Sequence, residues 1–255
     1  MLHTKIKNNP IFNKILIGVI WLLLWQAAAM LIDERLILVS PTDVILALIR
    51  LIPSPVFLTS VSVSLIRITG GFILGLFFGT LLASLAGRAR ILREFLAPFM
   101  TTVKAIPVAS FTILALFLIS SKNLSVLVTF LIALPVVYSN ILSGIDAIDK
   151  NMLEMSRLFG LGYAKRTVYI YFSQVLPYFK AASATACGLS WKSGVAAELI
   201  VIAKGTLGER LYDAKVGFEM AELFAWTVIV IILSHLTELV FRKLTDGVWK
   251  LIQRI

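Results

Sequence analysis

The chain has 255 residues, of which 59% are hydrophobic and only 15% are charged. A soluble domain of this length usually carries about 25% charged residues, so the composition predicts an integral membrane protein built as one domain. The net charge of +10 does not indicate nucleic acid binding, because the lysines and arginines are scattered between apolar runs rather than gathered on one face.

Few residues are available for catalysis or for binding a metal. Cys187 is the only cysteine, and His3 and His235 are the only histidines, so an intrachain disulfide and a Cys- or His-based metal cage are excluded. The only lysine followed by Ser or Thr is Lys192, and Trp191 rather than glycine precedes it, so there is no phosphate-binding loop. We therefore expect no enzyme, no metal site and no cofactor in this chain.

Six apolar segments have close to the roughly 20 residues that a membrane span needs. Because a backbone in lipid must satisfy its own hydrogen bonds, these segments are expected to be helices. Pro107, Pro135 and Pro177 interrupt the apolar pattern and favour kinks. After an N-terminal segment of residues 1–14, a single all-α domain of residues 15–250 is predicted, with spans at 15–32, 66–87, 95–119, 124–145, 174–201 and 221–241.

The first predicted span has an alternative interpretation. Lys5, Lys7 and Lys14 precede an apolar run that ends in QAAAM, which is similar to a secretory signal. The run is longer than a usual signal core and five further spans follow, which favours an uncleaved span. Between this span and the next, turn signals border a short interfacial helix that we expect at residues 42–51.

The distribution of positive charges predicts the orientation in the membrane. Three lysines fall inside spans, fourteen lysines and arginines fall on one set of loops and seven on the other. This bias predicts that both termini are cytoplasmic. The fourteen are Lys5, Lys7, Lys14, Arg88, Arg90, Arg93, Lys150, Arg157, Lys165, Arg166, Arg242, Lys243, Lys250 and Arg254.

Span 66–87 carries a small residue at every fourth position: Gly71, Gly75, Gly79, Ala83 and Gly87. Such a stripe lets another helix backbone approach closely. The spacing leaves open whether that helix belongs to the same subunit or to a second copy.

The longest predicted cytoplasmic loop, residues 146–173, contains a polar stretch of helical character. Asn151 is predicted to cap a short helix, with Glu154 reaching back as in a capping box. Gly160 or Gly162 is expected to end this helix, and a second short helix is expected at about 163–172. Met155 and Phe159 share an apolar face with Met152, whereas Arg157 and Glu154 share a charged one. The loop is therefore either a knob for a groove in a partner or a solvated loop that caps itself.

This stretch resembles the signature of the membrane subunits of bacterial ATP-binding-cassette importers. The signature is Glu-Ala-Ala, three residues, Gly, nine residues and Ile-x-Leu-Pro; Glu154, Gly160 and Ile170 match it. Met155 and Ser156 replace the two alanines, and Phe172-Ser173 replace Leu-Pro. Four further segments between residues 38 and 250 resemble permeases of the nitrate, sulfonate and taurine type: LVSPTDVILAL, VKAIPVAS, GLSWKSGVAAELI and GTLGERLYDAK.

The resemblance implies a permease subunit in the bacterial inner membrane that forms the translocation pathway for a small solute. Nitrate, a sulfonate, taurine and a vitamin precursor are the implied substrate types. The implied partners are two ATPase subunits, which bind ATP and Mg, a second permease copy or paralogue, and an extracytoplasmic substrate-binding protein. The implied ATPase-coupling loop comprises Asn151, Glu154, Met155, Ser156, Arg157, Phe159, Gly160 and Gly162.

Lys104, Pro107, Trp191, Lys192 and Glu198 are the candidate residues of the translocation pathway. A lysine inside a span costs roughly 2–3 kcal/mol on insertion scales, so Lys192 is expected to have a use. It either lines the pathway and meets an anionic substrate, or it snorkels to the headgroups or pairs with Glu198.

Two other classes of function are weighed against this one. A secondary transporter or channel without ATP coupling is expected to show repeats or broken helices near the midplane. An intramembrane enzyme needs a nucleophile with a base, for which His235 and Glu238 are the only candidates. Their simpler explanation is a polar contact within the bundle.

Overall fold

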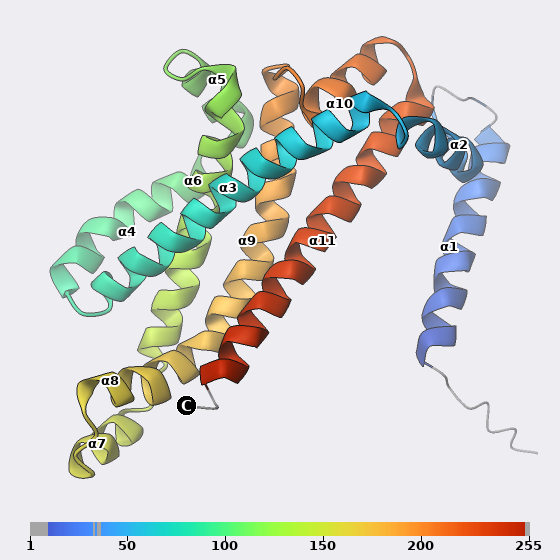
Figure 1. Ribbon diagram of the computed structural model, residues 1–255. Coiled ribbons are helices and arrows are strands. Elements are labelled where there is room, and N and C mark those ends of the chain that lie inside the picture. Colours follow the sequence, from blue (N-terminus) through green and yellow to red (C-terminus); the bar gives the residue numbers. More distant parts are fainter. Residues whose placement is uncertain (1–9, 33, 35–36, 253–255) are drawn as a thin grey trace, which may run out of the picture.

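The computed structural model describes residues 10–32, 34 and 37–252, and every regular element in these ranges is a helix (Figure 1). Residues 1–9 of the predicted N-terminal segment lie outside the described residues. The helices are α1 (Pro10–Ile32), α2 (Pro41–Leu51), α3 (Pro55–Ala86), α4 (Arg90–Ala105), α5 (Val108–Leu116), α6 (Ser121–Asp146), α7 (Lys150–Leu158), α8 (Tyr163–Arg166), the π-helical η1 (Thr167–Phe172), α9 (Ser173–Ile200), α10 (Leu207–Val216) and α11 (Met220–Ile252).

The all-helical membrane architecture is confirmed. Among the described residues, four helices are long and apolar enough to cross a membrane, namely α1, α3, α6 and α11, and the bent pair α4–α5 makes five if it counts as one span. The remaining predicted span corresponds to α9, which has 28 residues but carries Lys180, Lys192 and Glu198. Six spans therefore stay a prediction that counts α9 and the bent pair.

The span predicted at 95–119 is not one helix. Its two halves, α4 and α5, meet at an angle of 98°. Pro107 has no amide hydrogen to continue the helix, and it pushes the preceding residue into an extended conformation. Ile106 accordingly has φ −70° and ψ 125°. Pro135 and Pro177, by contrast, lie inside the continuous helices α6 and α9.

The core forms around α6, which packs against both α3 and α9. The small-residue stripe of α3 is what allows the first of these contacts. A Cβ atom placed on Gly71 would lie 1.8 Å from Thr129 Oγ1, and one on Gly75 would lie 2.4 Å from the Cβ of Ala133. Since both neighbours belong to α6, the stripe serves packing within one subunit.

The short helix expected at 42–51 is present as α2. Ser40 caps it, because its hydroxyl accepts a hydrogen bond from the backbone amide of Asp43. Helix α1 contacts the rest of the subunit through α2 and through the ring of Trp25, which lies against Phe224 of α11. Most of its apolar side chains are exposed, and Figure 1 shows it standing apart from the bundle.

The helices define two ends of the molecule. One end, called here the α7 end, carries α7, α8, the turn between α3 and α4, and the last turns of α11; the opposite α10 end carries α2, α10 and the turn between α5 and α6 (Figure 1). Helix α1 begins on the side of the α7 end, and α11 finishes there. The two termini of the described chain thus lie on one side, as the predicted topology requires.

Candidate functional site

Helices α7, α8 and η1 form a projection at the α7 end that is called here the knob. The residue that caps its first helix, α7, is not the predicted one. Asp149, not Asn151, precedes the helix, and its carboxylate Oδ1 accepts a hydrogen bond of 2.8 Å from the amide of Asn151. The predicted cap at Asn151 and its capping box with Glu154 are therefore wrong, because the helix begins at Lys150. Aspartate is a strong capping residue, so its position just before the polar stretch was the available signal.

The end of α7 follows the prediction, and of the two glycines it uses Gly160. This residue has a φ of +65°, a conformation that glycine adopts without steric cost. The amide of Leu161 donates to the carbonyl of Ser156, and the amide of Gly160 donates to that of Arg157, which together make a Schellman motif. Gly162 has a φ of −59° and precedes α8.

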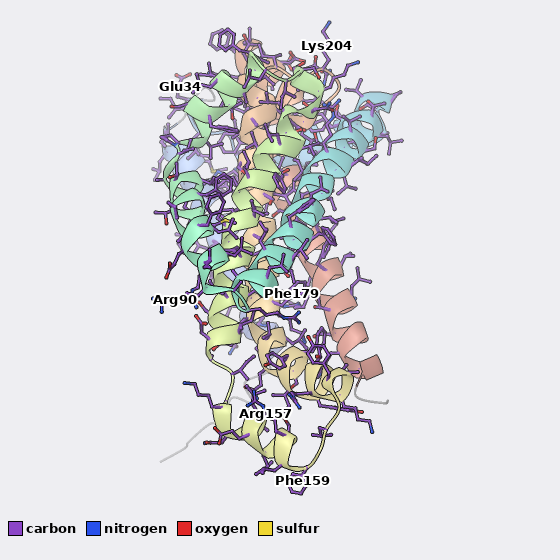
Figure 2. The ribbon with its side chains drawn as sticks, turned by 90° about the vertical axis from the view of Figure 1, so that its left-hand side faces the viewer. Glu34, Arg90, Arg157, Phe159, Phe179 and Lys204 are labelled. Atoms are coloured by element: carbon purple, nitrogen blue, oxygen red, sulfur yellow. The ribbon has the colours of Figure 1, made fainter. Side chains whose placement is uncertain are left out.

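The knob presents exposed apolar side chains. Leu158 is 87% and Phe159 is 78% exposed, and Met152 and Met155 are about half exposed, at 46% and 53%. Only Ser156 of this helix is buried. Glu154 and Arg157 are also exposed, and Figure 2 shows Phe159 at the extreme α7 end of the molecule, with Arg157 nearer the spans. Large apolar side chains exposed this way mark a site for a protein or membrane partner.

Side-chain hydrogen bonds hold the knob to the spans. Gln174, at the start of α9, accepts a hydrogen bond of 3.0 Å from the amide of Asp149. Arg88, after α3, donates to the hydroxyl of Tyr163 over 2.7 Å. The second short helix, expected at 163–172, consists of α8 and η1 and continues without a break into α9. Residues 163–200 therefore form one uninterrupted helical path from the α7 end towards the α10 end.

Lys104 lies in the last turn of α4, directly before the break at Pro107. Its ammonium group donates a hydrogen bond of 2.9 Å to the hydroxyl of Ser139 on α6, and its side chain is exposed. The charge thus stands on the surface of the subunit, where α4 crosses α6.

Lys192 and Glu198 point to different sides of α9. Lys192 is exposed, whereas Glu198 is 0% exposed, so the two do not form the pair that was one of the expectations. Ala181, Thr185 and Gly188, which are small or polar, form an exposed row with Lys192, and Leu189, which is 41% exposed, borders this row. Lipid-facing surfaces are normally formed by large apolar side chains, so this side of α9 is suited to a pathway or a second subunit.

Trp191 and Glu198 belong to the core of the subunit, and in this conformation neither borders an open surface. Glu198 Oε2 accepts a hydrogen bond of 2.7 Å from the hydroxyl of Ser64 on α3. The same hydroxyl accepts one of 2.9 Å from the amide of Leu207, at the start of α10. A Cβ atom on Gly208 would lie only 2.4 Å from the Cβ of Glu198. Glu198 therefore joins three helices at the α10 end.

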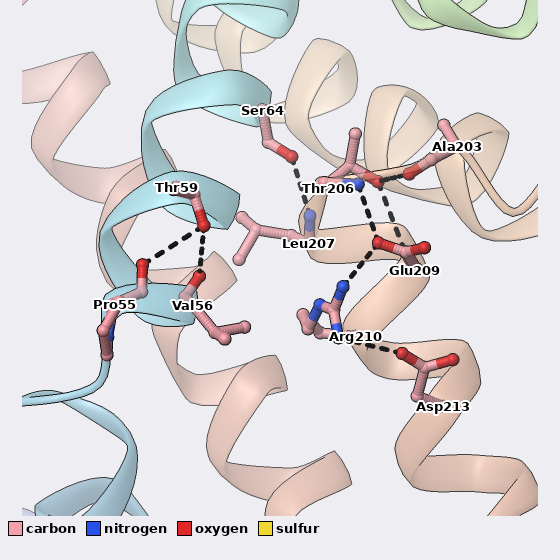
Figure 3. Close-up of polar contacts among 11 residues, drawn as sticks. Pro55, Val56, Thr59, Ser64, Ala203, Thr206, Leu207, Glu209, Arg210 and Asp213 are labelled. Carbon is pink, nitrogen blue, oxygen red and sulfur yellow. Dashed lines mark hydrogen bonds and ion pairs between the residues drawn. The ribbon is translucent and has the colours of Figure 1, made fainter.

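Figure 3 shows how the start of α10 is held in this junction. Thr206 caps the helix by accepting from the amide of Glu209, and its hydroxyl donates to the carbonyl of Ala203. Arg210 then pairs with Glu209 and with Asp213. These contacts fix the start of α10, which is formed by most of the segment GTLGERLYDAK.

The side chains considered for catalysis or metal binding lie apart from both regions. His235 is exposed on α11, and Glu238 is partly buried. Within the described ranges, no group of three or more His, Cys, Asp or Glu side chains is placed to hold a metal ion. The knob, the two exposed lysines and the junction around Glu198 are the candidate functional regions.

Comparison with known proteins places these features in a family. The profile described as binding-protein-dependent transport system inner membrane component matches residues 75–250. A Bacillus subtilis (strain 168) protein that carries the name of an aliphatic sulfonates transport permease, SsuC, is 24% identical over 232 residues, which cover 90% of this chain and 84% of the relative. The nitrate import permease NrtB of Synechococcus elongatus is 27% identical over 153 residues, 60% of this chain and 54% of the relative.

The fold is also found among solved structures. The crystal structure described as an amino acid ABC transporter with histidines superposes with a TM-score of 0.55, over 77% of this chain and 94% of that chain. Its sequence identity of 16% makes this a likeness of fold alone.

Proposed function

Because the chain belongs to the family of inner membrane components of binding-protein-dependent transport systems, we propose that ATP hydrolysis by separate ATPase subunits drives transport through it. The chain is a multi-pass permease component of an ABC importer in the inner membrane. In the proposal, two ATPase subunits bind ATP and Mg, a second permease copy or paralogue completes the pathway, and an extracytoplasmic binding protein delivers the substrate.

The exposed apolar tip of the knob carries this proposal. Met152, Met155, Leu158 and Phe159 would lose their contact with water by entering a groove of the ATPase, as amphipathic helices do in other complexes. The exposed charges of Glu154 and Arg157 would then form the polar rim around this contact. This arrangement requires the α7 end to face the cytoplasm, in agreement with the positive-charge bias.

The proposed motion follows the covalent and packing path through the subunit. Closure of the ATPases displaces α7, and the continuous helix from α8 through η1 to α9 carries that displacement towards the α10 end. There Glu198 links α9 to α3 through Ser64. Movement of α9 would therefore also move α3 at the α10 end, which is the side that receives the substrate in this proposal.

A small anionic solute is the proposed substrate class. Lys104 and Lys192 place two positive charges on the surface of the subunit. A charged side chain within a membrane-spanning segment normally marks a pathway or a binding site. The relatives named for sulfonate and nitrate transport support the same class. Nitrate, a sulfonate and taurine are the solutes to be tested.

The knob is tested by removing its most prominent ring. Phe159→Ser should abolish co-purification with the ATPase and ATP-driven uptake, while the chain still inserts into the membrane. Phe117→Ser is the matched control, since Phe117 is 85% exposed and lies after α5, towards the α10 end; it should leave the complex intact. Normal ATPase binding and uptake by the Phe159 variant would refute the proposal, and uptake that persists without ATP would favour a secondary transporter.

A further inference from the structure

A cavity of about 640 Å³ opens near the α7 end, between the knob and the spans. Helices α3, α6, α9 and α11 form its walls, and α8 and η1 close it on the side of the knob. Its volume lies within the range of about 300–1,000 Å³ that is typical of sites for small organic ligands. None of the residues assigned above to the substrate pathway lines it.

The walls of the cavity are apolar, and its charge is concentrated in one residue. Leu76, Ile141, Leu176, Phe179, Phe241 and Leu244 line the walls. Among the described residues that line it, only Arg88 carries a full charge, and its guanidinium donates to the hydroxyl of Tyr163, also a lining residue. The cavity therefore combines an apolar chamber with a cationic group, and it matches a ligand that has an apolar tail and an anionic head.

The position of the cavity determines what can fill it. Three of the four helices that form its walls, α3, α6 and α11, are long and apolar enough to cross a membrane, so hydrocarbon chains are expected around its opening. Lipid tails are as apolar as the cavity itself, and burial alone therefore gives little preference for binding. The preference must come from Arg88, and a guanidinium matches the geometry of a phosphate group.

We propose that this cavity binds an anionic phospholipid of the inner leaflet, with an acyl chain in the chamber and the phosphate on Arg88. The choice of leaflet rests on the proposed function, which places the α7 end in the cytoplasm. Basic pockets between spans on that side are suited to anionic headgroups. The lipid would contact η1 and α11 at once, and so would stiffen the connection between the knob and the spans.

The wall on the side of α11 is already held in place, so the chamber does not depend on a ligand to form. Lys180 of α9 forms an ion pair with Asp246 of α11. The rings of Phe172 and Trp249 stack with their centroids 6.2 Å apart. These contacts fix α11 beside α9, where Phe241, Leu244 and Thr245 line the cavity.

The test measures bound lipid on the purified membrane chain. The protein is reconstituted in nanodiscs of phosphatidylglycerol and phosphatidylcholine, extracted, and examined by native mass spectrometry for lipid retained through delipidation. The wild-type chain should retain phosphatidylglycerol in preference to phosphatidylcholine. Arg88→Gln should lower this retention several-fold, whereas Arg90→Gln, two residues away with its side chain 90% exposed, should not.

A second pair of variants fills the chamber. Thr80→Trp from α3 and Leu244→Trp from α11 each place a large ring in the cavity and should remove the retained lipid. Because the two tryptophan variants lie on different walls, the test remains valid if one of them does not fold. Equal retention by the Arg88 and Arg90 variants, or lipid that survives a folded tryptophan variant, would overturn the proposal.

Two further outcomes distinguish the lipid site from a contact with a second permease copy and from the proposed function. Cross-links from Thr80→Cys or Leu244→Cys to a second permease copy, in place of bound lipid, would show that protein fills the chamber and would also overturn it. Selective lipid binding by a chain that recruits no ATPase would leave the lipid site standing and refute the proposed function instead.

Discussion

The close approach of α3 and α6 predicts that one added methyl group at Gly75 destabilises the subunit. The new Cβ would lie 2.4 Å from the Cβ of Ala133 and 3.1 Å from the carbonyl oxygen of Phe130. Two carbon atoms in contact normally lie at least about 3.5 Å apart, so the first distance is short by about 1 Å. A Cβ atom cannot rotate away, and the two helices must separate along their contact.

Gly70→Ala is the matched control, because a Cβ at Gly70 meets nothing within 4 Å. Both substitutions gain the same helix propensity, about 1 kcal/mol in soluble helices. Overpacking of a core contact costs about 1–3 kcal/mol, so we expect Gly75→Ala to be less stable than Gly70→Ala by this amount. Combining Gly75→Ala with Ala133→Gly removes the shortest contact and should recover part of the loss.

The assay can use the natural thiol of the chain. Cys187 is 1% exposed and unpaired, so a thiol-reactive fluorescent maleimide should label it only as the detergent-solubilised protein unfolds. Thermal unfolding of Gly75→Ala, Gly70→Ala and the combined variant is then compared under one set of conditions. Equal stability of the two single variants, or no recovery in the combined one, would refute the packing argument.

Three further predictions concern the knob, the pathway and the topology. Asp149→Ala should lower the stability of α7 by about 0.5–2 kcal/mol and reduce ATPase recruitment, whereas Asn151→Ala should not; equal effects on recruitment would contradict the observed cap. Lys192→Met should reduce anion uptake while complex assembly and basal ATPase activity persist, and Lys192→Arg should restore part of it; unchanged uptake by Lys192→Met would remove this lysine from the pathway. Alkaline phosphatase fused after Lys122 should be active and after Lys150 inactive, and the opposite result would reverse the predicted orientation.

The helices and the knob could be predicted from the sequence because their signals are local. Long apolar runs predict helices wherever lipid is the solvent, and Gly160 ends α7 as its place in the polar stretch predicts. The cap was misplaced by two residues, because Asp149 and Asn151 are both good capping residues and spacing alone does not separate them.

Features that depend on distant parts of the chain were not predictable in the same way. The hydrogen bond between Ser64 and Glu198 joins residues that are 134 positions apart. Helical periodicity alone argues against a pair between Lys192 and Glu198, which are six residues apart on α9, but it does not identify Ser64 on α3 as the partner of Glu198. The helix breaks completely at Pro107, whereas Pro135 and Pro177 lie inside continuous helices, and the sequence around each proline does not distinguish the two outcomes.

The break between α4 and α5 has a consequence for hydration. Helix α5 begins with Pro107 at its cap position, and no side chain accepts hydrogen bonds from its first amide groups. Ala109 and Ser110, in that first turn, are exposed. Amide hydrogens without acceptors cost several kcal/mol each in hydrocarbon, so water has to reach the start of α5. Water is therefore expected beside Lys104, and hydrogen exchange of the amides of Ala109 and Ser110 should be fast compared with that of α6.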